Sequence, residues 1–294
     1  MYLQKSRGKR FLRTVRRAAS GVLLHARLSE RGLGRTRWIH RFGFGTVYGL
    51  FLKAHRIKPD KRVYNLLQSF KNYIMVLDPI IDSPEYRNGI VGQFDVRKLK
   101  SIPESRQLAS GFLEQLNKIS LSKEQKKEIL RIFTEFRRTA TENIARTMKD
   151  PFARKEDVLR GIEGTGGLFI GTASDIASIC YGLNAERRAI SRTAFENFTN
   201  GLDLMDDMKD AAIDYGIVQN SIVSISIKYP GEHKRLQEIA LKRRRKLSKR
   251  WLATNMPRTV EEAAIEFEKY MEKIPKNNRT KEIAEAARDA FYSF

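Results

Sequence analysis

The sequence predicts an all-α fold, a single-domain bundle of about ten or more helices, and three observations support that prediction. The chain has only 8 prolines in 294 residues, and 41% of its residues are hydrophobic, which suffices for a sizeable core. The strict alternation of polar and apolar residues that is typical of strands is almost absent. Glycines and prolines divide the chain into segments of about 10 to 25 residues, the length of ordinary helices. Because no repeat or low-complexity linker interrupts residues 31–294, we expect one domain there.

Residues 1–30 form a separate basic segment that we expect to be an amphipathic helix. Residues 1–41 hold twelve Lys and Arg but a single acid, Glu30. If the segment is helical, its apolar side chains share one side; they are Phe11, Leu12, Val15, Ala19 and Val22. This composition is typical of an organellar transit peptide and of a helix on a membrane surface, and a plain surface helix also fits it.

A long helix is predicted in the middle of the chain. Ser122 followed by Gln125 resembles a capping box, in which each side chain bonds the backbone of the other residue. The helical pattern then continues to about Met148, and Pro151 ends it because proline cannot continue a helix.

Three later segments are also assigned from local signals. Residues 164–182 are rich in small and apolar side chains but contain Asp175, so they predict a buried helix rather than a membrane span. Residues 221–229 alternate briefly and fit either a short strand or a buried helix. Thr259 with Glu262 predicts the start of a helix near the C-terminus.

A cluster of acids stands out in a chain whose formal charge is +22. Five aspartates lie within twelve residues, at Asp203, Asp206, Asp207, Asp210 and Asp214. Residues four apart share a helix face, where like charges destabilise the helix, so the cluster needs a cation or abundant water. A row of carboxylates supplies the oxygen ligands that Mg²⁺ prefers, with water and substrate phosphates completing its shell.

A second acidic pair lies about 125 residues upstream. Asp78 and Asp82 are four apart in an otherwise apolar stretch, with Pro79 between them. Two acidic rows on two apolar helices predict a bundle whose interior holds metal ions and a phosphorylated ligand.

The order and spacing of these motifs resemble the class I isoprenoid synthases, and most of all the trans-polyprenyl diphosphate synthases. Asp78-Pro79-Ile80-Ile81-Asp82, followed four residues later by Arg87-Asn88-Gly89, is similar to the family's DDxxD motif and the RRG-like segment after it. Leu202 to Asp214 is similar to its second aspartate motif. The segment Gly34 to Arg37 matches a basic motif before the first acids, and Gly164 to Gly182 matches a helix before the second. The resemblance implies helices around a central cavity.

The resemblance implies an Mg²⁺-dependent enzyme that ionises an allylic prenyl diphosphate, most simply a chain-elongating prenyltransferase. Its metal ligands would be Asp78, Asp82, Asp206, Asp207, Asp210 and Asp214, of which Asp78, Asp82, Asp206 and Asp210 are the candidate catalytic residues. The diphosphate would be bound by Arg35, Arg37 and Arg87, because guanidinium groups match phosphate oxygens. The cavity would be lined by Phe70, Tyr73, Ile74 and Phe169.

Departures from the family's pattern keep two alternatives open. Pro79 replaces an acid, Asn88 replaces an arginine, and Gly164 stands where the family has a diphosphate-binding lysine. A class I terpene synthase or cyclase tolerates a looser first motif. A regulatory subunit without catalytic activity would also explain the losses.

The remaining expectations concern location and partners. The single Cys180 fits a reducing compartment, so we expect a cytoplasmic protein. Residues 1–28 and the basic run Lys242 to Arg250 suit peripheral contact with an anionic membrane. The family resemblance implies a homodimer. A nucleic-acid binder is the weaker reading of the basic runs, because the acid clusters would repel phosphate.

Overall fold

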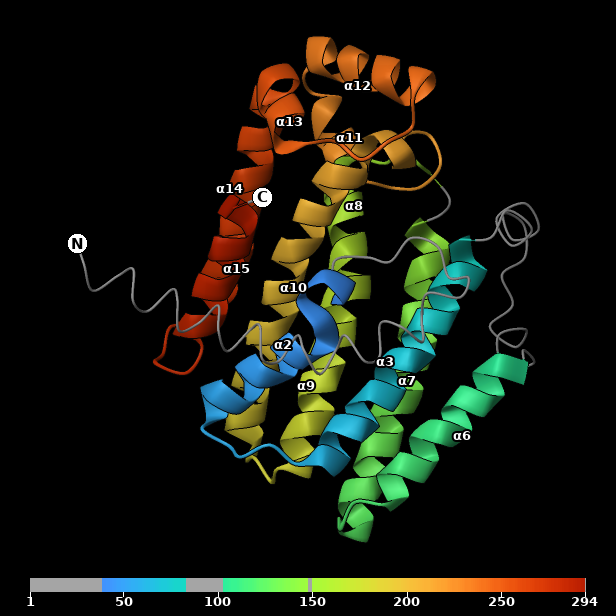
Figure 1. Cartoon of the computed structure of the whole chain (residues 1–294), viewed down its shortest axis with the longest axis vertical. Helices are drawn as coiled ribbons and strands as arrows, with labels where there is room; N and C mark the ends of the chain where they lie inside the picture. The colour runs from blue at the N-terminus through green and yellow to red at the C-terminus, as the bar shows by residue number, and fades with distance from the viewer. Residues whose placement is uncertain (1–38, 83–102, 148–149, 294) are drawn as a thin grey trace.

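The computed structural model describes residues 39–82, 103–147 and 150–293, and it confirms the all-α prediction. Every regular element in these ranges is helical (Figure 1). The α-helices are α2 (Ile39–His55), α3 (Lys61–Asp82), α6 (Pro103–Asn117), α7 (Lys123–Thr147), α8 (Lys155–Ile162), α9 (Leu168–Cys180), α10 (Ala185–Asp214), α11 (Ser221–Ser226), α12 (Pro230–Lys242), α13 (Lys249–Asn255), α14 (Pro257–Lys273) and α15 (Lys281–Ser293). A π-helical turn, η1 (Glu163–Gly167), joins α8 to α9.

Helix α10 is the central element of the bundle. It packs against α9, η1, α14, α15, α11 and α12, while α9 also contacts α7 and α3, and α3 packs on α6 (Figure 1). Helix α10 begins at Asn184, whose side chain accepts a hydrogen bond from the Arg187 amide, as an N-cap residue should. The longest described helix therefore contacts helices that precede it in the chain as well as helices that follow it.

Helix α7 shows how the sequence pattern produces the packing. Its buried side chains recur every three or four residues, so they form one apolar face; they are Ile129, Ile132, Phe133, Phe136 and Ala140. The predicted capping box is present, with the Ser122 amide 2.9 Å from Oε1 of Gln125 and the Gln125 amide 3.1 Å from Oγ of Ser122. The helix is described as far as Thr147, and its predicted end near Met148 lies outside the described residues.

Helix α9 is buried on almost all sides, as its small and apolar residues predict. Its one acid, Asp175, is 3% exposed and lies 2.7 Å from Nη1 of Arg192 and 3.6 Å from Nε of Arg188, both on α10. Burial raises the pKa of Asp175, and the two arginines oppose that rise. The acid therefore joins the two innermost helices.

Two local predictions are refined by the structure. Residues 221–226 are helical, and the alternative of a short strand is wrong, because Asn220 caps them by accepting bonds from Ile222 and Val223. Thr259 does not open its helix. Helix α14 begins at Pro257, whose missing N–H suits a first helical position, and Thr259 instead donates to Glu232 from its backbone and its hydroxyl.

Two further points concern the ends and the membrane. Across the described ranges, the helices are all too short or too polar to cross a bilayer. The segment 1–30 lies outside the described residues, so its helix and the domain boundary at residue 31 stay predictions.

Candidate functional site

The five aspartates lie on the C-terminal half of α10 and point to one side of it. At about 100° per residue, their positions fall within an arc of about 100° around the helix axis. All five are partly buried; they are Asp203, Asp206, Asp207, Asp210 and Asp214. The structure thus confirms that the acids share a helix face, whereas their role as metal ligands stays a prediction.

Two of the acids hold the start of α11. The Ser221 amide donates to Oδ2 of Asp207 at 2.8 Å. The Asn220 side chain, which is fully buried, donates from Nδ2 to Oδ2 of Asp214 and to the backbone oxygen of Asp207, each at 3.0 Å. The loop after α10 therefore folds back onto the acidic face.

The buried position of Asp207 makes its carboxyl hold a proton more tightly than an exposed aspartate does. Burial raises the pKa of its carboxyl to about 8, although hydrogen bonding from Ser221 favours the charged form. The negative charges of Asp214 and Asp203 add to the rise. A cation beside this carboxyl would lower its pKa, because an opposite charge favours the ionised carboxylate.

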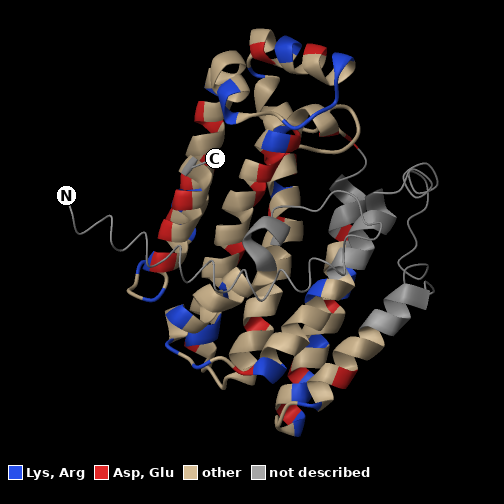
Figure 2. Ribbon diagram, in the orientation of Figure 1, with Lys and Arg blue, Asp and Glu red and all other residues tan. Residues whose placement is uncertain are grey.

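A basic segment lies across the same helix end. Residues Arg243 to Ser248, which join α12 to α13, run past the acidic end of α10 (Figure 2). The Lys246 ammonium is 3.0 Å from Oδ1 and 3.2 Å from Oδ2 of Asp210. The Leu247 amide donates to the backbone oxygen of Lys209 at 2.7 Å, and the Leu247 side chain is 3% exposed. Leu247 therefore fixes the segment in a position where Lys246 reaches Asp210.

A further contact on this face involves η1. The carboxylate of Asp203 occupies the space that a Cβ at Gly166 would need, and the amide of Asn200 does the same at Gly167. A side chain at either position would force these groups to move, so glycine favours the close approach of α10 and η1. The π turn itself is rare and often occurs at functional sites. It includes Gly164, which the motif resemblance places where the trans-polyprenyl diphosphate synthases have a diphosphate-binding lysine.

The donor set on α10 fits a hard divalent cation in its chemistry. Oδ1 of Asp210 is buried and, in the described part of the chain, makes an ion pair with Lys246 but no hydrogen bond of good geometry. Within the described ranges, three or more His, Cys, Asp or Glu side chains do not gather closely enough to hold an ion by themselves. Mg²⁺ commonly takes only one or two carboxylates and completes its shell with water and phosphate oxygens, so the row on α10 suits one part of such a site.

The first acidic motif lies on α3, which ends at Asp82. Helices α3 and α10 both run upwards in Figure 1, so their acidic C-terminal ends lie at the same end of the bundle. The structure describes side chains of α3 only as far as Tyr73, so Asp78, Asp82 and Ile74 fall outside that part. The predicted diphosphate-binding residues Arg35, Arg37 and Arg87 also lie outside the described residues.

The predicted cavity-lining residues are buried in an aromatic cluster. Phe70, Tyr73 and Phe169 are 0%, 2% and 3% exposed. The ring centroid of Phe70 is 5.3 Å from that of Phe169 and 5.0 Å from that of Phe136, while Tyr73 lies 5.2 Å from Phe133. These contacts place the residues in the core beside α7 and α9; that they line a substrate cavity stays a prediction.

The sequence did not identify two residues of this site. Lys246 belongs to the run that the sequence assigned to a membrane surface, yet it is paired with Asp210. Asn220 is a loop residue whose Asn-Ser sequence indicates a helix cap but nothing about Asp214. A single feature of the sequence indicated that residues 203–214 and 242–250 could come into contact: the first segment is acidic and the second is basic.

Comparisons with known proteins place the fold. Neither the protein-family models nor the curated protein sequences give a match to this chain. Among solved structures, the geranylgeranyl pyrophosphate synthetase from Pyrococcus horikoshii Ot3 is similar, with a TM-score of 0.55, 16% identity, and coverage of 83% of this chain and 84% of that chain. The geranylgeranyl pyrophosphate synthetase from the archaeon Geoglobus acetivorans has a TM-score of 0.59, 16% identity, and coverage of 84% and 85%. The resemblance seen in the motifs is thus confirmed at the level of architecture: this chain has the all-α fold of the geranylgeranyl pyrophosphate synthetases.

Proposed function

We propose that this chain is an Mg²⁺-dependent isoprenoid synthase that ionises an allylic prenyl diphosphate and elongates it as a prenyltransferase. The single observation that carries the proposal is the row of carboxylates on α10, at the end of the bundle where α3 and its acidic pair also end. The fold shared with geranylgeranyl pyrophosphate synthetases supports it.

The carboxylates would hold the metal ions against the diphosphate. Asp206 and Asp210 are the ligands from α10, with Asp207 and Asp214 beside them, and the ligands from α3 are Asp78 and Asp82. Mg²⁺ bound there would act as a Lewis acid and stabilise the negative charge that develops on the departing diphosphate.

The cationic side chains of this chain would orient the same diphosphate. Lys246 already lies at the acidic end of α10, so it can contact a phosphate oxygen once a metal ion takes over Asp210. Arg35, Arg37 and Arg87 are proposed for the same role. The proposed lining of the cavity would keep water from the allylic cation; it consists of Phe70, Tyr73, Ile74 and Phe169. The faces of its aromatic rings would stabilise the positive charge by about 0.5–2 kcal/mol.

The test is an assay with farnesyl or geranylgeranyl diphosphate and Mg²⁺, with and without isopentenyl diphosphate. An elongated diphosphate supports the proposal, and the Asp206→Asn and Asp210→Asn variants should then lose at least about 100-fold in rate. Asp289→Asn, an exposed acid on α15, is the matched control and should be unaffected. A hydrocarbon or alcohol formed without isopentenyl diphosphate would instead identify a terpene synthase. No release of diphosphate under any condition would refute both enzymatic readings.

A second candidate is a regulatory subunit without catalytic activity. The contacts on α10 favour it, because Lys246 pairs with Asp210 while Asn220 and Ser221 bind Asp214 and Asp207. These protein groups satisfy carboxylates that a catalytic site would leave for metal. Co-purification with a complete prenyl synthase, together with inactivity of the isolated chain, would support this candidate. We also propose that the chain forms a homodimer, which sedimentation of the purified protein tests.

A further inference from the structure

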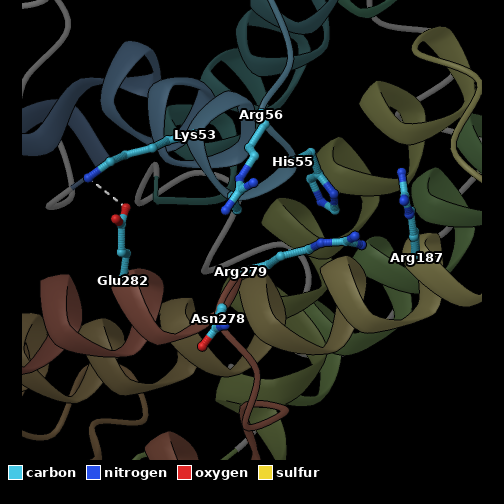
Figure 3. Close-up of a pocket in the computed structure, with 8 residues that line it drawn as sticks. Lys53, His55, Arg56, Arg187, Asn278, Arg279 and Glu282 are labelled. Atoms are coloured by element: carbon cyan, nitrogen blue, oxygen red, sulfur yellow. Dashed lines mark ion pairs between the residues drawn. The ribbon is translucent and has the colours of Figure 1, made fainter.

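A basic pocket lies far from the aspartates, at the opposite end of α10. It has a volume of about 440 Å³ and is formed by the end of α2, the first turn of α10 and the turn that precedes α15 (Figure 3). Arg187, in its wall, and Asp206 are separated by 19 residues of the same helix, or about 28 Å. The pocket is therefore distinct from the acidic face.

The pocket carries more positive charge than its own acids neutralise. Its charged walls come from Lys53, Arg56, Arg187, Arg279 and Glu282. Glu282 is already paired, since its carboxylate lies 2.6 Å from the Lys53 ammonium (Figure 3). Within the described part of the chain, the guanidinium groups of Arg56, Arg187 and Arg279 form no ion pairs. Three like charges that face one hollow repel one another, so an anion between them would be stabilising.

Arg56 sits in the pocket wall at a cost in backbone strain. Its φ is 55°, in the left-handed region that favours glycine. The bonds from the Arg56 amide to Lys53 and from the Ile57 amide to Leu52 end α2 in a Schellman motif, where glycine is the usual residue at this position. The charged group of Arg56 is directed at the pocket (Figure 3), and an arginine at this strained position indicates a role for that charge in the pocket.

His55 supplies a further polar group to the same wall. Its Nε2 is 3.0 Å from Oγ of Ser191, which lies 2.8 Å from Oγ of Ser174. Its Nδ1 is buried and has no hydrogen-bond partner within the described residues. If the Ser191 hydroxyl donates to Nε2, then Nδ1 carries the proton of the neutral ring and is an unsatisfied donor, but this atom is closed to solvent, so the arginines provide the contacts for an anion.

We propose that this pocket binds a phosphate-bearing ligand. Guanidinium groups bind phosphate oxygens through paired hydrogen bonds, and a hollow of this volume suits a small molecule or a lipid headgroup. The proposal does not depend on the reaction at the aspartates, because the residues that line the pocket and the aspartates lie at different ends of α10 and do not overlap.

Titration calorimetry with inorganic pyrophosphate, in EDTA so that no metal bridges it to the aspartates, tests this site. The double variant Arg187→Gln/Arg279→Gln should bind at least tenfold more weakly than the parent chain. The control Arg235→Gln/Arg258→Gln removes the same charge from exposed positions elsewhere, outside the basic run Lys242 to Arg250, and should change affinity less than twofold. In parallel, sedimentation with phosphatidylcholine vesicles, with and without phosphatidic acid, tests a lipid source of the phosphate.

Binding in either arm that is lost in the pocket variant alone supports the proposal, and the arm in which it occurs identifies the source. Equal losses in both double variants, or no binding by the parent chain in either arm, would overturn it. Arg56→Gly provides a second check, because glycine relieves the strained φ at this position. This variant should melt at a higher temperature than the parent chain yet bind the anion more weakly; unchanged binding counts against the site.

Discussion

The ammonium group of Lys246 lies 3.0 Å from Oδ1 of Asp210, an ion pair between the basic segment and the acidic face of α10. Asp210 is an expected metal ligand, so Lys246 occupies a position that a divalent cation would compete for. The pair places a positive charge from a distant part of the chain at the acidic end of the bundle.

Removing this competitor should strengthen metal binding. We expect Lys246→Ala to bind Mg²⁺ about two- to fivefold more tightly, the range of a partly exposed ion pair worth about 0.5–1 kcal/mol. Calorimetric titration with MgCl₂ measures this. Arg245→Ala, an exposed neighbour in the same segment, is the control and should change the affinity less. Weaker Mg²⁺ binding by Lys246→Ala would show that the lysine does not compete for Asp210.

The close approach of η1 to α10 predicts a specific destabilisation. Gly166→Ala places a methyl group where the Asp203 carboxylate lies, so we expect a loss of about 1–3 kcal/mol in the free energy of unfolding. Gly111→Ala, in α6, meets open space and should instead stabilise the protein by about 0.5–1 kcal/mol, because alanine favours the helix. Urea denaturation of both variants measures the two effects. If Gly166→Ala and Gly111→Ala change the free energy of unfolding equally, the packing described for η1 is wrong.

The pairing of α8 with α14 predicts how stability depends on pH. The Glu262 carboxylate lies 2.9 Å from both the Lys155 and Lys228 ammonium groups and accepts a bond from the Tyr229 hydroxyl at 2.7 Å. Burial opposes ionisation of Glu262, but the bonds from Lys155, Tyr229 and Lys228 outweigh it and lower its pKa to about 2.

Because this folded-state pKa is below the ordinary value of 4.5, the stabilisation is complete above pH 4.5 and is lost as the pH falls towards 2. We therefore expect Glu262→Gln to be less stable than the parent chain at neutral pH and to lose less stability between pH 4.5 and 2. Urea denaturation at several pH values measures both. The control Glu261→Gln, at an exposed neighbouring residue, should have the same stability as the parent chain at each pH. If Glu262→Gln also has the stability of the parent chain at each pH, the ion pairs of Glu262 do not contribute to folding.

The aromatic cluster predicts a large cost for losing its centre. Phe70 is fully buried, and its ring contacts those of Phe136 and Phe169 at 5.0 Å and 5.3 Å between centroids. We expect Phe70→Ala to lower the free energy of unfolding by about 3–5 kcal/mol, as measured by chemical denaturation. Phe152→Ala, at a ring that is 45% exposed, should cost far less. A small cost at Phe70 together with a changed product length would instead place Phe70 in a substrate cavity.

The parts of the fold that depend on local sequence were predictable. The capping box at Ser122 and Gln125 and the buried character of α9 both follow from residues within a few positions of one another. The shared face of the aspartates follows from the helical period alone. These features need no knowledge of what packs against them.

The contacts of the site were not predictable, because they join residues that are far apart in the sequence. Lys246 and Asp210 are 36 positions apart, and their meeting depends on the path of α11 and α12 between them. The local sequence predicts the start of α14 at Thr259, whereas the helix begins at Pro257. The difference arises because Glu232 of α12, and not a neighbouring residue, accepts the bonds of that helix end. The basic pocket joins α2, α10 and the turn before α15, and no sequence window contains all three.

The location of the acids near the carboxyl end of α10 has an electrical consequence. Aligned peptide dipoles leave the last turn of a helix with a partial negative charge, so aspartates there are repelled by the backbone as well as by one another. The final turns of α10 are therefore stabilised by donors from outside the helix, of which Lys246 carries a full positive charge. Amide hydrogens near Asp210 and Asp214 should consequently exchange with solvent most slowly when a divalent cation is bound, which makes the order of this helix end a direct reporter of occupancy.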